Sequence, residues 1–499
     1  MGFLVKREYF RPEAARLEEA ALRVGPGASY YRLTMGGAAV GYSASTLDTT
    51  PTGIVVQNNT VFDIQALGTV QRTGITQIFN LTRTMRLVNF DAQLQSDVAK
   101  FRASGRVDGD SVLEMTVEAG GAPQHQRMRL TEPMVMAELV NLQLALGGEL
   151  EVGRSFSVRA FDPLTLQQRQ VQLTVLAEST FIVPDSAAYD SAGSRWVPAS
   201  YDTLRSFKVS QQMAGLSIDA WIDERGNIVQ ATSPIGLSVE RTAFEIAVQN
   251  FRVDRERGAT SAAGAGSDVI STTAIAANVR LRPEGLDSLR VRLKNVALEG
   301  FDLSGGRQRL AGDTLIIRRE RGLVPGQAGF NTGVPMGSGG DTAVARALQP
   351  EPLVQSDDAR IQAQARQIVG RERRAGRVAE LLNRWVYDNL EKEITISVPS
   401  AVQVLDMRRG DCNEHTVLYV ALARAVGLPA RTAAGVVYLR GQFFYHAWPE
   451  VWLGEWVAVD PTFGQFPADA AHLRFVIGGL ARQVELVRLI GRLQLEVIQ

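Results

Sequence analysis

The chain has 499 residues, of which 45% are hydrophobic. Such a length and composition allow roughly two to four domains with sizeable cores. Lysine plus arginine number 53, aspartate plus glutamate also number 53, and the formal net charge is therefore zero. Because nucleic-acid binding needs a basic surface, we expect no nucleic-acid partner.

The sequence gives no sign of export or membrane insertion. No apolar run reaches the roughly 18 residues of a membrane-spanning helix, and Met1–Arg7 lacks the apolar core of a signal peptide. We therefore expect a soluble, unexported protein, although one cysteine fits any compartment. If the true start lies upstream, Gly2–Val5 is the stump of a membrane anchor, and the cell envelope becomes the expected location. The oligomeric state is not predicted.

The first half of the chain has the pattern of a β-rich N-terminal domain, residues 1–257. A short helix is expected over Pro12–Arg23, and strand-like runs such as Tyr30–Met35 then alternate with turn signals. This spacing predicts large antiparallel sheets that curl into half-barrels or sandwiches. Helical interruptions are expected near Pro133–Leu146 and Glu240–Gln249.

Two stretches rich in small residues divide the rest of the chain. Gly258–Ser267 is a predicted linker because it is rich in glycine, alanine and serine. A second β-rich unit is expected over 268–321, where Leu289–Leu293 alternates apolar and basic residues. Gly322–Ala343 is again flexible in composition, so we place the main domain boundary in a linker at 322–350.

From Ser356 the pattern becomes helical and opens a C-terminal domain, residues 351–499. Ser356 is a suitable N-cap for a first helix. In a second helix, apolar residues recur at three- and four-residue steps over Val378–Leu390 and define one buried face. We expect a closing helix over Gly479–Leu493 and a last strand over Leu493–Ile498.

The only cysteine of the chain, Cys412, is expected at the start of a third helix. Asp411 is a good N-cap, and Gly427 and Pro429 end the apolar body of this helix. Unpaired N–H groups at a helix N-terminus stabilise a thiolate and can bind an oxyanion. We therefore expect a lowered pKa for Cys412.

His446 and Asp460 lie on two consecutive strand-like runs, Gln442–Trp452 and Glu455–Asp460. A two-residue hairpin loop would put them on opposite faces of the sheet. A loop of odd length, or a bulge, would set His446 directly opposite Asp460 on one face. We predict such a loop or bulge, because Cys, His and Asp together form a thiol acyl-transfer triad.

Several motifs of this region resemble the transglutaminase-like superfamily. They are Gly410–Cys412, the helix end Arg424–Arg431, His446–Val451 and Trp456–Thr462. They occur in the order and at the spacing of that family, and the resemblance covers about residues 350–475.

The resemblance implies an α+β, papain-like domain in which a helix packs on an antiparallel sheet. Cys412 would then be the nucleophile, His446 the general base and then acid, and Asp460 the residue that orients the imidazole. The implied substrate is a peptide or protein amide, and we favour resolution of the thioester by water over transfer to an amine. Trp448 is the aromatic residue expected to line the cleft. The alternative is a catalytically idle binding or assembly module with the same fold.

We expect no metal and no cofactor. A zinc site of Cys412, His415 and His446 is conceivable, since zinc takes thiolate and imidazole, but no paired Cys or His motif supports it. His415 is expected to pack or cap. His125 and His472 lie in no motif and are expected to be incidental.

Overall fold

The structure is a computed structural model. It describes residues 25–66, 69–97, 99–109, 111–148, 150–213, 216–233, 236–257, 270, 273–320, 342–395 and 397–498. The helix expected over Pro12–Arg23 and the linker expected over Gly258–Ser267 lie outside the described residues, as does most of Gly322–Ala343.

The protein is mixed α/β and rich in strands, and it divides into two compact units. The first unit contains most residues up to 268, and the second contains 269–499 together with the short pieces 98–100 and 118–124. The division therefore falls before the segment expected as a second β-rich unit, whereas the sequence placed the main boundary at 322–350. None of the helices in the described part of the chain has the length and apolar character that crossing a membrane requires.

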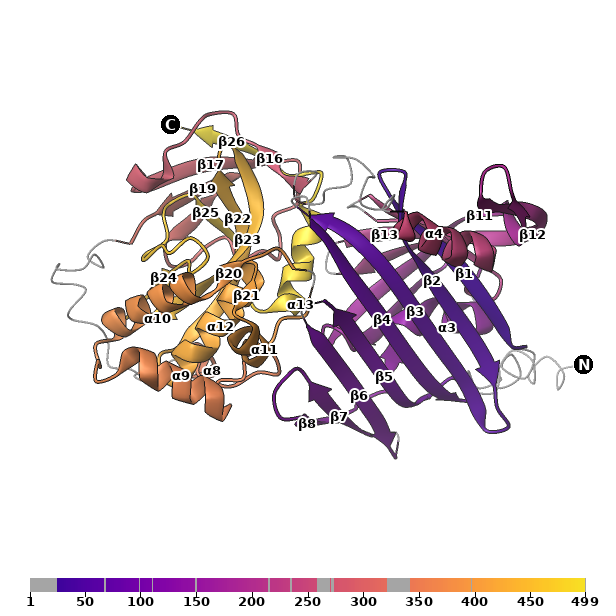
Figure 1. The fold of residues 1–499 in the computed structure, drawn as a ribbon, viewed down its shortest axis with the longest axis horizontal. Helices are drawn as coiled ribbons and strands as arrows, with labels where there is room; N and C mark the ends of the chain where they lie inside the picture. The colour runs from indigo at the N-terminus through magenta and orange to yellow at the C-terminus, as the bar shows by residue number, and fades with distance from the viewer. Residues whose placement is uncertain are drawn as a thin grey trace, which may run out of the picture. The chain divides into compact units, whose positions relative to one another are not determined.

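One sheet of 15 strands dominates the first unit (Figure 1). Its strands are β1 (Gly27–Met35), β2 (Ala38–Thr49), β3 (Gly53–Ala66), β4 (Thr69–Thr82), β5 (Leu87–Ser96), β6 (Lys100–Asp108), β7 (Val112–Glu118), β8 (Gln124–Arg129), β9 (Val135–Met136), β10 (Ser155–Asp162), β11 (Gln167–Asp190), β12 (Arg195–Met213), β13 (Leu216–Asp223), β14 (Ile228–Thr232) and β15 (Leu237–Thr242). The sheet runs from β8 down to β1, continues through β15 down to β10, and ends at β9.

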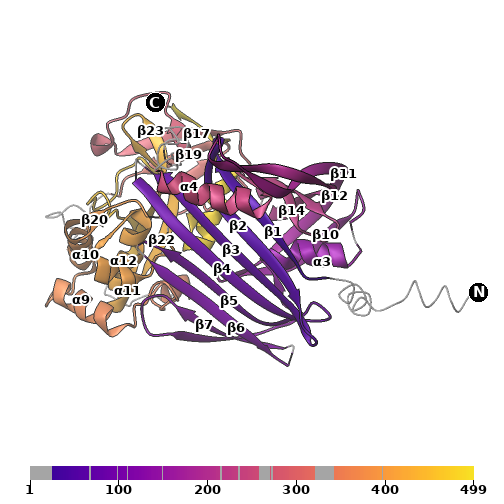
Figure 2. The ribbon, with the colours of Figure 1, turned by 45° about the vertical axis from the view of Figure 1, so that its right-hand side comes forward.

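This sheet curls on itself, as the sequence predicted for residues 1–257 of the chain. Figure 2 shows β1–β7 at the centre and β10–β12 to their right, on the other side of β1. Phe90 of β5 and Phe161 of β10 lie on the two halves of the sheet, yet their ring centroids are 5.9 Å apart. The curl therefore encloses an apolar core between the two halves.

The two expected helical interruptions are confirmed. The first is α3 (Val140–Leu146), and the second is a π-helical turn over Glu245–Gln249 that continues into α4 (Asn250–Glu256). The second starts later than expected, because β15 extends to Thr242 to pair with β1.

The second unit joins a helical layer to two small sheets. Its helices are α8 (Thr342–Arg346), α9 (Ala359–Val369), α10 (Ala375–Asn389), α11 (Ala401–Met407), α12 (Cys412–Ala425) and α13 (Leu480–Gln483). One sheet has the order β16 (Ile275–Ala276), β23 (Gln442–Trp452), β22 (Ala430–Leu439) and β25 (His472–Ile477), with β24 (Trp456–Ala458) also paired to β23. The other has the order β18 (Gln308–Ala311), β19 (Thr314–Arg318), β17 (Ser288–Lys294) and β26 (Gln494–Ile498). A further pair joins β20 (Glu391–Lys392) to β21 (Arg409–Gly410).

Residues 268–321 do not form a unit of their own. The antiparallel pair of β17 with β26 sets Leu293 opposite Leu495, and β16 pairs with β23. Leu289, Val291 and Leu293 are buried in a core shared with β22 and β25. The physical reason is that the four short strands of this segment, β16–β19, bury too little apolar surface to be stable alone.

The helical layer begins and ends much as the pattern predicted, with two differences. Asp358, not Ser356, caps α9 by accepting a hydrogen bond from the N–H of Arg360 at 2.8 Å. The expected closing helix is only α13 and a 3-10 turn over Val484–Arg488, whereas the last strand is present as β26.

Candidate active site

The start of α12 is built around the Gly-Asp-Cys sequence. Asp411 is the N-cap and accepts a hydrogen bond from the N–H of Asn413 at 2.7 Å, while Glu414 accepts from the N–H of Asp411 at 2.9 Å. Gly410 has φ of 153°, and a Cβ there would lie 2.3 Å from the Glu414 Cβ. Only glycine therefore fits so close to Glu414. With Asp411 as the N-cap, Cys412 is the first helical residue, as predicted.

We expect Gly410→Ala to lower the melting temperature and to slow alkylation of Cys412, because the new Cβ displaces Glu414 and opens the capping box. Gly441→Ala is the matched control, since Gly441 has φ of 98° but nothing within 4 Å of the added Cβ. The control should cost only about 1 kcal/mol for its backbone conformation. Equal losses in the two variants would contradict the crowding argument.

The β23–β24 hairpin has the odd-length loop that the sequence predicted. Trp452 pairs with Trp456, which leaves three residues in the loop. Continued beyond β24, this register sets Asp460 opposite Trp448, and not directly opposite His446 as expected. His446 and Trp448 are two residues apart on one strand, so His446 and Asp460 still share a face of the hairpin.

A direct hydrogen bond joins His446 to Asp460, with Nε2 and Oδ2 2.7 Å apart. The other carboxylate oxygen accepts from the backbone N–H groups of Thr462 at 2.7 Å and Phe463 at 3.1 Å. Burial raises the pKa of Asp460, but the charges and hydrogen bonds of His446 and His472 outweigh it and hold that pKa far below its usual range. Asp460 is therefore an anion. The groups that hydrogen-bond to its carboxylate, two histidine rings and two backbone N–H groups, all act as donors.

Aromatic rings pack around His446. Phe463 stacks on it with ring centroids 4.9 Å apart and planes 14° apart, and Trp448 lies 6.1 Å away. Trp448 is fully buried, so the expectation that it lines an open cleft is wrong. Phe463 is 36% exposed and is the aromatic residue that separates His446 from solvent.

Cys412 lies beside the strand that carries His446. Its helix α12 contacts β22 and β23. Burial, and then the Asp411 carboxyl, raise the pKa of the Cys412 thiol well above its usual value, although the N–H of Ala447 donates to it and lowers that pKa. The expected lowering by the helix N-terminus is therefore outweighed by desolvation. A thiol in this setting needs a nearby base to become a thiolate, and Ala447 directly follows His446 in β23.

His472 is a member of the site that the sequence reasoning missed. It is fully buried at the start of β25, and its Nε2 lies 2.9 Å from Asp460 Oδ2. Its Nδ1 lies 2.9 Å from Asp469 Oδ1. The only sequence signal was an acidic residue three positions before a histidine in an apolar run, which is common in loops.

The segment between 273 and 320 forms hydrogen bonds with the backbone on both sides of Asp460. The buried Arg307 donates from Nη2 to the carbonyl oxygens of Ala468 at 2.9 Å and Asp469 at 2.7 Å. Glu320 accepts from the N–H of Ala458 at 3.1 Å. These contacts explain why this segment packs with the C-terminal residues.

A metal does not fit the cluster as it stands. One ligand atom each of His446, Asp460 and His472 lies within 4.8 Å of the others, the one such group among the described residues. Zinc with ligands near 2.0–2.1 Å keeps tetrahedral ligand atoms about 3.3 Å apart, yet both histidine nitrogens lie within 2.9 Å of Asp460 Oδ2. These are hydrogen-bond distances. Cys412 and His415 do not belong to the group, and His415 instead caps locally, with Nδ1 2.7 Å from the Asp411 carbonyl oxygen.

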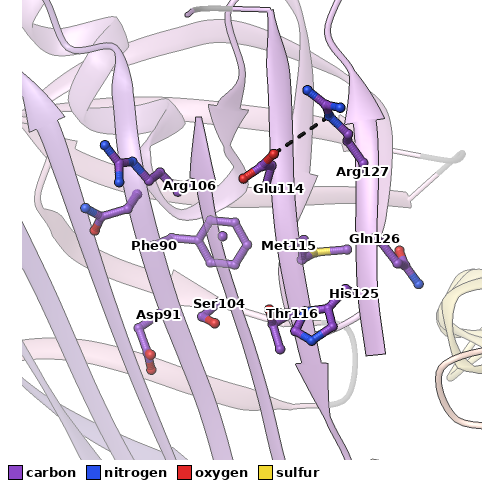
Figure 3. A pocket seen from close by; sticks show the side chains of 12 residues that line it. Phe90, Asp91, Ser104, Arg106, Glu114, Met115, Thr116, His125, Gln126 and Arg127 are labelled. Carbon is purple, nitrogen blue, oxygen red and sulfur yellow. Dashed lines mark hydrogen bonds and ion pairs between the residues drawn. The ribbon is translucent and has the colours of Figure 1, made fainter. Parts of the chain in front are cut away.

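The first unit has a separate hollow of about 580 Å³ over β5–β8 (Figure 3). Phe90 and Met115 lie at its middle. Glu114 pairs with Arg127 at 3.8 Å at one end, and His125 lies near Thr116 at the other, with Nδ1 and Oγ1 3.1 Å apart. His125 therefore has an ordinary polar partner on a strand surface.

Comparison with known proteins agrees with the motifs. Residues 362–461 match the transglutaminase-like superfamily and include Cys412, His446 and Asp460. No curated protein matches the chain.

Three solved structures are similar to parts of the chain. One, described as a candidate cysteine protease from Cytophaga hutchinsonii, is 16% identical, with a TM-score of 0.27, over 42% of this chain and 83% of that one. A β-barrel-like protein of unknown function from Brucella abortus is 12% identical, with a TM-score of 0.30, over 44% and 95%. A protein from Pseudomonas aeruginosa is 10% identical, with a TM-score of 0.23, over 38% and 88%. The family match and the motifs together identify residues 362–461 as a transglutaminase-like segment, which belongs to a family of thiol-dependent enzymes.

Proposed function

We propose that this protein catalyses acyl transfer on peptide or protein amides through a thioester at Cys412. The observation that carries the proposal is the 2.7 Å bond from His446 Nε2 to Asp460 Oδ2. His446 and Ala447 are consecutive residues of β23, and the backbone N–H of Ala447 donates a hydrogen bond to the Cys412 sulfur. The finer assignment, a papain-like helix packed on a sheet, is part of the same proposal.

In the first step, His446 acts as a base. Its Nε2 proton faces Asp460, so Nδ1 is the nitrogen that takes the proton of the Cys412 thiol. The sulfur attacks the amide carbonyl and forms the C–S bond, while the backbone N–H of Cys412 holds the oxyanion. The C–N bond then breaks, and the amine leaves with the proton from His446.

In the second step, water or an amine resolves the thioester. His446 takes a proton from the incoming nucleophile, the C–S bond breaks, and the proton returns to the sulfur. Net consumption is one amide and one water for hydrolysis, or one amide and one amine for transamidation. We favour hydrolysis, because Phe463, whose ring stacks on the buried His446, is itself 36% exposed, so water lies at the edge of the site.

Trapping of the acyl-enzyme tests this proposal. The full chain is mixed with a panel of peptide amides, quenched in acid and digested, and the Cys412 peptide is weighed by mass spectrometry. We expect an acyl adduct in the wild type, none in Cys412→Ser, and free acid as the product when a labelled primary amine competes. Persistent incorporation of the amine would instead assign transamidation. No adduct and no turnover across the panel would contradict the proposal.

The second candidate is a catalytically idle module with the same fold. It is favoured by one observation, the burial that raises the pKa of the Cys412 thiol. In that case the sulfur is a small apolar group in the core of the second unit, and iodoacetamide leaves it unmodified even at alkaline pH.

A further inference from the structure

Both ring nitrogens of His472 face carboxylates. Nε2 lies 2.9 Å from Asp460 Oδ2, and Nδ1 lies 2.9 Å from Asp469 Oδ1. A neutral imidazole has a single N–H, so it can donate to only one of them. Two donated bonds require the imidazolium.

The carboxylates offer no proton in return. Asp469 also accepts from Gln465 Nε2 at 2.9 Å and from the N–H of Ala471 at 2.9 Å. The oxygens of Asp460 accept from two backbone N–H groups and from His446. Every such partner is a donor, which favours two ionised carboxylates with a charged ring between them.

The protonation equilibria agree with this geometry. Burial lowers the pKa of His472, but its hydrogen bonds to Asp460 and Asp469 outweigh that and raise it above the usual value. Burial raises the pKa of Asp469, and the hydrogen bond and charge of His472 reverse the shift and lower it. Two other buried charged groups lie nearby and bond to backbone atoms. Arg307 donates to the carbonyl oxygen of Asp469, and Glu320 accepts from the N–H of Ala458.

We propose that His472 is a positioning residue, a permanent imidazolium that with Asp469 fixes Asp460 and sets the charge that His446 experiences. This role rests on the proposed function, because it matters only if His446 exchanges protons with Cys412. One carboxylate with one cation and a second carboxylate leaves a net charge of about −1 beside His446. Asp460 then keeps its lone pair toward His446 Nε2–H and holds the ring in the orientation from which it protonates the leaving amine.

Imidazole NMR tests the charge state directly. The chain has four histidines, so ¹⁵N-histidine labelling with one His→Gln variant at a time assigns every ring. We expect His472 to show both N–H protons at neutral pH, where a histidine with its usual pKa has lost one of them. A His472 ring that titrates near its ordinary pKa, or a neutral tautomer at neutral pH, would overturn the proposal. This readout involves no acyl transfer, so its outcome is separate from that of the trapping experiment.

Two variants test the effect on His446. His472→Gln leaves the charge of Asp469 uncompensated beside the site and should shift the pH profile of Cys412 alkylation to lower pH, because the added negative charge favours a thiolate–imidazolium pair. Adding Asp469→Asn removes the extra charge and allows the two new amides to hydrogen-bond, so the double variant should bring that profile back toward the wild type. A residue that acts by packing alone would leave the pH profile unchanged in both, and that result would contradict the charge-setting role. If His472→Gln does not fold, the double variant and the wild-type spectra carry the test.

Discussion

Asp460→Asn is expected to lower the turnover of amide substrates by about 10⁴-fold, the scale seen when a triad carboxylate becomes an amide. One carboxylate oxygen now accepts from His446 at 2.7 Å and from His472 at 2.9 Å. An asparagine offers one oxygen, so its NH₂ group would face either the two histidines or the backbone N–H groups of Thr462 and Phe463. The favourable choice of oxygen for the backbone turns the NH₂ group toward the histidines. His446 would lose the bond that keeps its proton on Nε2, and His472 would lose one of its two anions.

The measurement is the single-turnover rate of Cys412 acylation, together with the melting temperature. Asp388→Asn is the matched control, because Asp388 pairs with Arg384 at 3.6 Å on the exposed face of α10. The control should match the wild type in both readouts. An Asp460→Asn protein with wild-type rates would show that Asp460 plays no part in the chemistry.

The largest expected loss of stability comes from Glu450→Gln, about 3–5 kcal/mol, because it removes one partner of a buried ion pair. Glu450 is fully buried and accepts from Arg474 Nη1 at 2.7 Å and Arg431 Nη2 at 2.6 Å. Arg474 is only 2% exposed. A neutral glutamine at position 450 leaves the buried guanidinium of Arg474 without its counter-charge, next to the strand β23 that carries His446.

The stability difference between wild type and Glu450→Gln should depend on pH in a defined direction. Burial raises the pKa of Glu450, but Arg474 and Arg431 outweigh it, and the net shift is downward. A lowered folded-state pKa stabilises the protein above the unfolded value of about 4.3 and loses that effect as the pH falls through the folded value. The difference should therefore be full at neutral pH and shrink only in acid.

Chemical unfolding at several pH values measures this difference. Glu455→Gln, in the three-residue loop of the same hairpin, is the control and should be neutral. A Glu450→Gln variant as stable as the control at pH 7 would contradict the account of the buried pair.

Local features of this site could be predicted from the sequence. The start of α12 at Cys412 follows from Asp411 and the apolar steps after it, which are short-range signals. The odd-length loop between Trp452 and Trp456 follows from the need to set His446 and Asp460 on one face. The residue opposite His446 was misjudged, because the pairing of Trp452 with Trp456 sets Asp460 opposite Trp448 and not opposite His446.

Features that depend on distant parts of the chain could not be predicted in this way. His472 meets Asp460 only because the chain between them turns back on itself, and no periodicity in the sequence encodes that turn. β17 pairs with β26 across some 200 residues, so its membership of the second unit has no local signature. The raised pKa of Cys412 likewise reflects burial, which outweighs the helix N-terminus that the sequence did reveal.

Alkylation of Cys412 tests the central claim most directly, because it is the only cysteine and any adduct is unambiguous. Iodoacetamide modification is followed by mass spectrometry at about pH 6 and pH 8.5 in the wild type and in His446→Ala. If His446 takes the proton of the partly buried Cys412 thiol, the wild type reacts readily at the lower pH and His446→Ala loses that reactivity by at least about 10-fold. A thiol that stays inert at both pH values, or that reacts equally well without His446, would contradict the account.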